Sequence, residues 1–145
     1  MSSEIWWTAP AESEDGRTIM VSGRDNLEKQ IMSGKYTCRI EIRWPYAPSP
    51  AGMPDTETAK LMEQADIALR EALKKDKACI LTGVYTGAGQ RDWVVYTKNP
   101  HIFQAVVNRA WADLPLLPVS FYAEQDADWA EYREMREATY IPDAD

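Results

Sequence analysis

The sequence predicts an α+β fold of the ferredoxin-like kind, in which two helices back one face of an antiparallel βαββαβ sheet. Three observations predict it. Residues 36–44 alternate apolar and polar side chains, which is the period of a strand with one buried face. Two later segments have the three-and-four spacing of amphipathic helices. Strand-like runs follow each of them, so right-handed crossovers place all the strands in one sheet.

One domain of 145 residues is expected. Residues 36–123 would form the ferredoxin-like core. Residues 1–35 would add an N-terminal β-hairpin, with strands at 5–8 and 17–22 and a turn at Asp15-Gly16. Residues 124–145 would add an acidic C-terminal helix and tail. These additions would extend a sheet edge or cover the second face of the sheet.

The strand at residues 36–44 has the clearest pattern. Its apolar side chains, Tyr36, Cys38, Ile40, Ile42 and Trp44, are predicted to face the core, and Arg39, Glu41 and Arg43 are predicted to face outward. Four prolines within residues 45–54 then predict a loop, because proline lacks the amide donor of a central strand.

Capping residues mark the starts of the two core helices. Asp55 or Thr56 can cap a helix that runs to about Lys75. Asn99-Pro100 starts the second helix, which Leu114-Pro115 would end. Between and after the helices, strands are predicted at residues 78–86, 91–97 and 117–124. A capped acidic helix is predicted at residues 126–138.

Three glycines between residues 83 and 89 raise the question of a phosphate-binding loop. No lysine follows at the spacing of a P-loop, and the dinucleotide pattern fails at Asp92. A strand also follows where a phosphate site needs the start of a helix. The cluster is therefore interpreted as a hairpin tip, in which glycine supplies positive φ.

The composition excludes several functional classes. The net charge of −7 argues against binding to duplex nucleic acid or to a membrane surface. The only cysteines, Cys38 and Cys79, lie in apolar runs, which favours buried thiols and a reducing cytoplasm. The single histidine, His101, falls at an exposed helix start. No catalytic motif, cofactor site or metal site is predicted, so the sequence favours a protein that is not an enzyme and leaves an enzymatic function open.

A binding surface is predicted on the sheet face that the two core helices leave open. The first core strand would contribute Arg39, Glu41 and Arg43, and the last would contribute Tyr122. The third strand would add either Arg91 and Trp93 or Asp92 and Tyr96. The candidate surface, with the terminal helix included, is Arg39, Glu41, Arg43, Arg91, Trp93, Tyr122, Asp126, Asp128, Trp129 and Tyr132. Alternatively, these mixed charges pair across strands beneath the hairpin or the terminal helix.

Four segments resemble domain of unknown function 695, a bacterial family. They are Trp6, "AGMPDTE" at 51–57, "GAGQRDWVVYT" at 87–97 and "DADWAEY" at 126–132. That family has no assigned reaction, so the resemblance implies no catalytic residue. Some of its members are similar in architecture to the ribonuclease E regulator B proteins, which are small acidic regulators. The resemblance therefore implies a regulatory role with a protein partner.

Two functions remain open at this stage. The first is a non-enzymatic binding or regulatory module whose partner carries a basic patch, because acidic residues gather in the terminal helix. The second is a small-molecule-binding or hydrolytic enzyme. Its anion would be held by Arg39, Arg43 or Arg91 near the proline-rich loop and the hairpin tip at 86–91. A homodimer formed through a sheet edge or the terminal helix is a further possibility.

Overall fold

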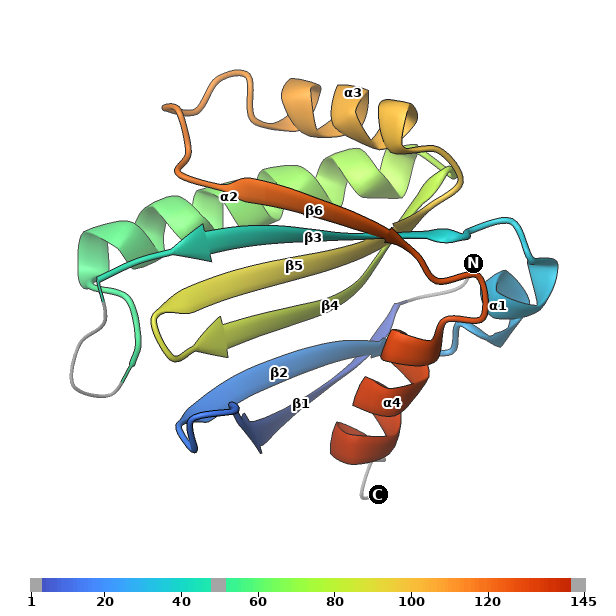
Figure 1. Ribbon diagram of the computed structural model, residues 1–145. Coiled ribbons are helices and arrows are strands. Elements are labelled where there is room, and N and C mark those ends of the chain that lie inside the picture. Colours follow the sequence, from blue (N-terminus) through green and yellow to red (C-terminus); the bar gives the residue numbers. More distant parts are fainter. Residues whose placement is uncertain (1–3, 48–51, 142–145) are drawn as a thin grey trace.

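The computed structural model describes residues 4–47 and 52–141 (Figure 1). In chain order its elements are β1 (Ile5–Glu12), β2 (Thr18–Asp25), α1 (Glu28–Ser33), β3 (Cys38–Pro45), α2 (Thr56–Lys75), β4 (Cys79–Gly87), β5 (Gln90–Thr97), α3 (Pro100–Ala110), β6 (Ser120–Gln125) and α4 (Ala130–Thr139). The predicted proline-rich loop at residues 45–54 lies partly outside the described residues.

All strands form one antiparallel sheet in the order β1-β2-β4-β5-β3-β6. The α+β class is therefore confirmed. The sheet has six strands where four were expected, because the N-terminal hairpin extends it. Strand β2 pairs with β4, and Val21 lies opposite Tyr85 in that register. Of the two places left open for the hairpin, it occupies the sheet edge.

Helices lie on both faces of the sheet (Figure 1). Helices α2 and α3 pack on one face, where α2 contributes Met62, Ala65, Leu69 and Leu73 to the main core and α3 contributes Phe103, Val106 and Val107. Helix α4 packs on the opposite face, where Trp129 and Tyr132 join a second cluster with Tyr96 of β5. The terminal helix therefore covers one end of the second face, which was the other place left open for it.

The alternation in β3 is confirmed on its apolar side. Ile40 and Ile42 are 3% and 0% exposed and face α2 and α3. The prediction that Arg39 faces solvent is wrong, because Arg39 points away from these helices but is only 8% exposed. Neighbouring side chains, among them Glu41 and Glu124, cover Arg39.

The predicted starts of the two core helices are confirmed, whereas the terminal helix, predicted from residue 126, starts at Ala130. The Asp55 side chain accepts a hydrogen bond from Thr58 N at 2.7 Å, and the Asn99 side chain accepts one from His101 N at 2.8 Å. Helix α3 ends at Ala110, before the predicted Leu114-Pro115. The residues between form turns, and β6 accordingly begins at Ser120.

Two of the three glycines, Gly87 and Gly89, form the tip of the β4–β5 hairpin as predicted, whereas Gly83 lies within β4. Gly87, Ala88 and Gly89 all have positive φ, at 141°, 55° and 85°. A side chain at Gly87 would meet the backbone of Ile19 at 2.9 Å, so glycine also permits the close approach of β2. No helix N-terminus lies at this tip, since β5 follows it directly.

Candidate functional site

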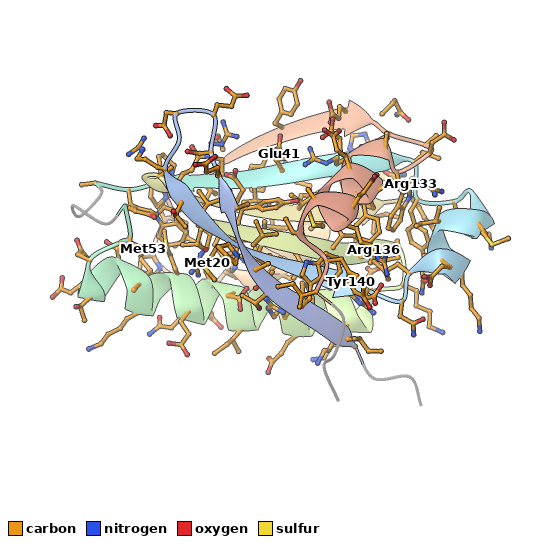
Figure 2. The ribbon with its side chains drawn as sticks, turned by 90° about the horizontal axis from the view of Figure 1, so that it is seen from below. Met20, Glu41, Met53, Arg133, Arg136 and Tyr140 are labelled. Atoms are coloured by element: carbon orange, nitrogen blue, oxygen red, sulfur yellow. The ribbon has the colours of Figure 1, made fainter. Side chains whose placement is uncertain are left out.

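The candidate site lies on the sheet face opposite α2 and α3, which is called the open face here. Helix α4 covers one end of this face, where Trp129 stacks on Tyr96 with ring centroids 4.1 Å apart. Figure 2 looks at the molecule from the sheet edge formed by the β1–β2 hairpin, with α2 below the sheet and α4 above it, and places Glu41 in the part of the face that α4 leaves uncovered. Charged side chains of β3, β5 and β6 form the floor of that part.

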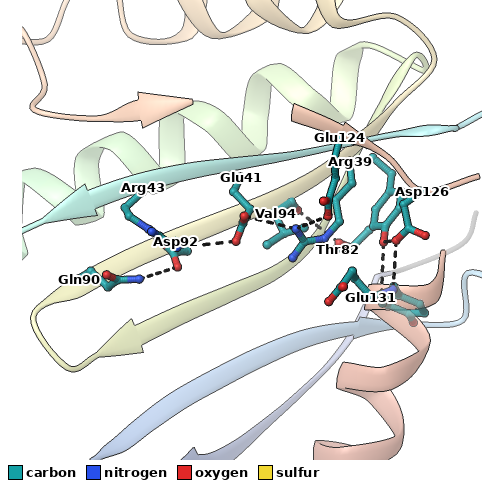
Figure 3. Close-up of polar contacts among 12 residues, drawn as sticks. Arg39, Glu41, Arg43, Thr82, Gln90, Asp92, Val94, Glu124, Asp126 and Glu131 are labelled. Atoms are coloured by element: carbon teal, nitrogen blue, oxygen red, sulfur yellow. Dashed lines mark hydrogen bonds and ion pairs between the residues drawn. The ribbon is translucent and has the colours of Figure 1, made fainter. Parts of the chain in front are cut away.

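These charges form a row of ion pairs across the strands (Figure 3). Arg43 Nε lies 3.1 Å from Asp92 Oδ1 and its Nη2 lies 3.9 Å from Glu41 Oε1. Arg39 Nη1 lies 3.5 Å from Glu41 Oε2 and 3.4 Å from Glu124 Oε1. The expectation that mixed charges pair across strands is confirmed for this row.

Arg39 is buried because neighbouring side chains close over it. Glu124 of β6 and Glu41 bind its terminal nitrogen, while its Nε donates to no group of the described residues. Burial opposes the charged form of Arg39, but nearby acidic groups, first Glu41 and then Tyr96, Tyr85 and Glu131, outweigh burial and raise its pKa. The guanidinium therefore stays charged inside a ring of acids.

Asp92 is the acid at the other end of the row. It is 7% exposed, and burial raises the pKa of its carboxyl although the hydrogen bonds from Arg43 and Gln90 oppose that shift. The hydrogen bond with Asp92 raises the pKa of Arg43 in turn. Beside this pair, burial raises the pKa of Tyr85 to about 12. The floor therefore contains a neutral phenol between charged groups.

A cleft of about 490 Å³ lies at this end of the open face. Its floor includes Arg43 and Asp92, and its walls are the β1–β2 loop at residues 13–17 and the hairpin tip at residues 87–90. No signal in the sequence indicates a functional role for the β1–β2 loop. Its position depends on the pairing of β2 with β4, which brings two hairpin ends together.

Asp126 has a structural role rather than a place on the binding surface. Its Oδ1 accepts from Ala130 N at 2.8 Å, and its Oδ2 accepts from Tyr96 Oη at 2.6 Å and from Glu131 N at 3.1 Å. Burial would raise the pKa of Asp126, but these hydrogen bonds, that of Tyr96 first, lower it below the ordinary value. The carboxylate fixes the start of α4 to the sheet.

The structure places the ten predicted surface residues in different environments. Glu41, Arg43 and Tyr122 share the open face and reach solvent, and Asp128 is exposed at the start of α4. Trp93, Trp129 and Tyr132 are buried at 0%, 1% and 5% exposure and cannot meet a partner. The remaining members are Arg39 and Asp126, described above, and Arg91.

The alternatives left open for the third strand are decided by its neighbours. Trp93 belongs to the core beneath α2 and α3, so Arg91 and Trp93 do not belong to the open face. Asp92 and Tyr96 lie on it instead. Arg91 is thus on the opposite side of the sheet from Arg39 and Arg43, and one anion cannot bind to all three.

Two acids outside the ten-residue candidate surface complete the site. Glu124 follows Tyr122 by two residues in β6, so the period of the strand could have identified it. Glu131 of α4 lies on the same side as Glu41 in Figure 3 and contributes to the raised pKa of Arg39. No local pattern identifies Glu131, because its position depends on how α4 packs on the sheet.

Within residues 4–47 and 52–141, no three His, Cys, Asp or Glu side chains are grouped so that they could hold a metal ion. None of the helices in this part of the chain is both long and apolar enough to cross a membrane.

Comparison with known proteins gives one match. The sequence pattern of the family of unknown function DUF695 matches residues 6–135. No curated protein and no solved structure matches the chain. The matched segment includes every strand of the open face and the first half of α4. The chain therefore belongs to the DUF695 family.

Proposed function

We propose that this protein is a non-enzymatic binding or regulatory module that engages a basic segment of a protein partner on its open face. The observation that carries the proposal is the surplus of acid on this face. Four carboxylates, those of Glu41, Asp92, Glu124 and Glu131, accompany two guanidinium groups, those of Arg39 and Arg43. The surplus is two negative charges.

Burial decides which of these charges a partner meets. The Arg39 side chain is 10% exposed, whereas the side chains of Glu41 and Glu124 are 23% and 36% exposed. Glu131 is exposed on α4. The Arg43 side chain is 48% exposed, but it lies at the other end of the row, where it pairs with Asp92. At the end formed by Glu41, Glu124 and Glu131, a Lys or Arg side chain from a partner would therefore meet carboxylates first, while the buried Arg39 holds two of them in place.

The aromatic side chain available for such contact is Tyr122, which is 60% exposed on the edge strand β6. Tyrosine contributes contact area at low cost in conformational entropy and is enriched at protein interfaces. Its neighbour Phe121 is 53% exposed on the other side of the strand, where it packs edge-on against Phe103. Tyr122 therefore serves as the apolar anchor beside the carboxylates of Glu41, Glu124 and Glu131, which together are called the acidic rim.

Binding of a Lys- and Arg-rich peptide, measured by fluorescence anisotropy at two salt concentrations, tests this function. In the double variant Glu124→Gln and Glu131→Gln we expect binding to weaken at least fivefold at low salt. The matched control is Glu63→Gln with Glu71→Gln, which removes the same charge from exposed positions of α2. Asp126 is left unchanged because α4 depends on it.

Equal weakening in both double variants would mean that only the net charge of the protein matters, and the proposed interface would be wrong. A pull-down with wild-type protein and both variants extends the test to natural partners. We expect natural partners to bind the wild type and the α2 control variant. We expect the same partners not to bind the variant with Glu124→Gln and Glu131→Gln.

We also infer that β4, β5, β3 and β6, with α2 and α3, form a ferredoxin-like unit to which the β1–β2 hairpin is attached. Its support is the chain order strand, helix, strand, strand, helix, strand over these elements. The free, buried thiols of Cys38 and Cys79 favour a cytoplasmic location. Recovery of the protein in a secreted fraction with an oxidised cysteine would contradict that location.

A further inference from the structure

A second cleft lies on the other face of the sheet, between α2 and the β1–β2 hairpin. It consists of two adjoining cavities of about 890 and 340 Å³, and Arg70 of α2 lines both. Met20 of β2 and Met53, which precedes α2, line the smaller cavity, and Figure 2 shows both at the same end of the hairpin. The cleft exists because the hairpin extends the sheet beyond the side of α2.

This cleft is basic in an acidic protein. Its lining includes five basic side chains, Arg24, Arg70, Lys74, Lys77 and Arg91, and three acidic ones, Glu4, Asp66 and Asp76. The balance is two positive charges, whereas the whole chain carries a net charge of −7. Such a local reversal of sign attracts anions from solution.

The three acids of the cleft already have hydrogen-bond donors. Asp66 accepts from Trp93 Nε1 at 2.9 Å and from Arg70 Nε at 2.8 Å. Glu4 accepts from Trp6 Nε1 at 3.0 Å, and Asp76 accepts from Ala78 N at 2.9 Å. Within the described residues, by contrast, no carboxylate lies within ion-pair distance of Arg24, Lys77 or Arg91.

Two buried polar atoms of the larger cavity lack partners among the described residues. They are Arg24 Nε, a donor, and Gln30 Oε1, an acceptor. A buried polar atom without a hydrogen bond costs about 1 to 3 kcal/mol, so a ligand that satisfies both atoms gains binding free energy. The ligand must bring an acceptor for Arg24 and a donor for Gln30.

Arg70 is positioned for such a ligand before it binds. Its guanidinium carbon lies 4.6 Å from the centroid of the Trp6 ring, and its Nε donates to Asp66. These contacts restrict the side chain and leave the terminal nitrogens of Arg70 without a described partner. A guanidinium held in this way loses little entropy when it binds an oxyanion.

We propose that the cleft between α2 and the β1–β2 hairpin binds a small oxyanion that also carries hydroxyl groups, of the sugar phosphate or sugar acid class. Arg24 and Arg70 hold the phosphate or carboxylate group, and a ligand hydroxyl donates to Gln30 Oε1. This site is independent of the proposed function, because it lies on the opposite side of the sheet from Glu41 and Arg43. Failure of either proposal leaves the other untouched.

Isothermal titration with ribose 5-phosphate, gluconate and inorganic phosphate tests the site and separates the two ligand sources. We expect one of the two hydroxylated probes to bind saturably and more tightly than inorganic phosphate. Arg24→Gln should weaken that binding at least tenfold, since it removes a charge-assisted hydrogen bond. Arg109→Gln, at an exposed position in the last turn of α3, is the matched control and should bind as the wild type does.

A second measurement locates the ligand without any variant. The side chains of Trp6 and Trp129 lie on opposite faces of the sheet. On titration with the probe that binds, only the indole N–H signal of Trp6 should shift in NMR spectra. The inference is overturned if neither ribose 5-phosphate nor gluconate binds saturably. It is also overturned if Arg24→Gln and Arg109→Gln weaken binding equally, or if both indole signals shift alike.

Discussion

The phenolic hydroxyl of Tyr96 donates a hydrogen bond of 2.6 Å to Asp126 Oδ2, which connects the middle of the sheet to the start of α4. The same hydroxyl accepts a hydrogen bond from Tyr132 N at 3.3 Å. The Tyr96 side chain of β5 is thus hydrogen-bonded both to a residue that precedes α4 and to a residue within it. Burial, followed by the bond to Asp126, raises the pKa of Tyr96. The position of α4, and with it that of Glu131, depends on this connection.

Substitution of Asp126 should therefore destabilise the fold. Asp126→Ala removes a cap from α4 and leaves the Tyr96 hydroxyl without its acceptor, so we expect the free energy of unfolding to fall by about 2 kcal/mol. Urea denaturation followed by circular dichroism measures it. Asp128→Ala is the control, because its exposed side chain should contribute within about 0.5 kcal/mol. Similar losses in both variants would contradict the capping role.

The contribution of Asp126 should also depend on pH. Its pKa in the folded protein is lowered from 3.8, so the charged carboxylate stabilises the fold above that value, and this contribution is lost as the pH falls through the folded pKa. The stability difference between the wild type and Asp126→Ala should therefore narrow as the pH falls below about 4. A difference that stays constant over this range would show that the charge is unimportant.

Gly23 should be sensitive to substitution because of Trp7. A Cβ atom at Gly23 would clash with the Trp7 ring, and Trp7 Nε1 donates to Thr139 Oγ1 at 3.0 Å. We expect Gly23→Ala to cost about 1 to 3 kcal/mol by displacing the indole from α4. The loss should shrink in a Trp7→Leu background, as a double-mutant cycle would show. An equal loss in both backgrounds would exclude a clash with Trp7.

Arg39 allows the contributions of packing and charge to be separated. Arg39→Met keeps an unbranched side chain and removes a buried charge, while Glu41 and Glu124 can bind water, so we expect a loss below about 1 kcal/mol. Arg39→Ala leaves a cavity and should cost about 2 kcal/mol. Chemical denaturation of both variants measures the difference. A larger loss in the methionine variant would show that the ion pairs dominate.

The two thiols should be inert in the folded protein. Cys38 of β3 and Cys79 of β4 both pair with Thr97 of β5, which lies between these two strands. Two strand spacings therefore separate their Cα atoms by about 10 Å, which is too far for a disulfide. Burial raises the pKa of both thiols. We expect both to react with Ellman's reagent only when urea unfolds the chain. Rapid reaction of either thiol in native buffer would contradict this burial.

Local chemistry let the sequence determine many elements on its own. Asp55 and Asn99 mark helix starts because their side chains accept from the first free amide groups of a helix. The glycines at residues 87 and 89 mark the hairpin tip because few other residues adopt positive φ. Ile40 and Ile42 were assigned to the core because β3 has only one apolar side.

The faces of β5 were decided by tertiary structure. Its residues from Asp92 to Thr97 are buried on both sides, so its sequence lacks the alternation that would have separated Trp93 from Asp92. Arg39 was misassigned for a related reason. A charged residue in a period-two pattern is expected outside, but Glu124 comes from a strand distant in the sequence, and α4 covers the adjoining end of the face.

Both proposed sites likewise depend on contacts between distant segments. The acidic rim needs α4 packed beside β3, and the basic cleft needs β2 paired with β4 beside α2. Periodicity and capping act over a few residues, so the sequence alone determined the elements and the inner side of β3. Strand pairing and helix docking are set by the burial of apolar surface over the whole chain, and they alone decided which charges came together.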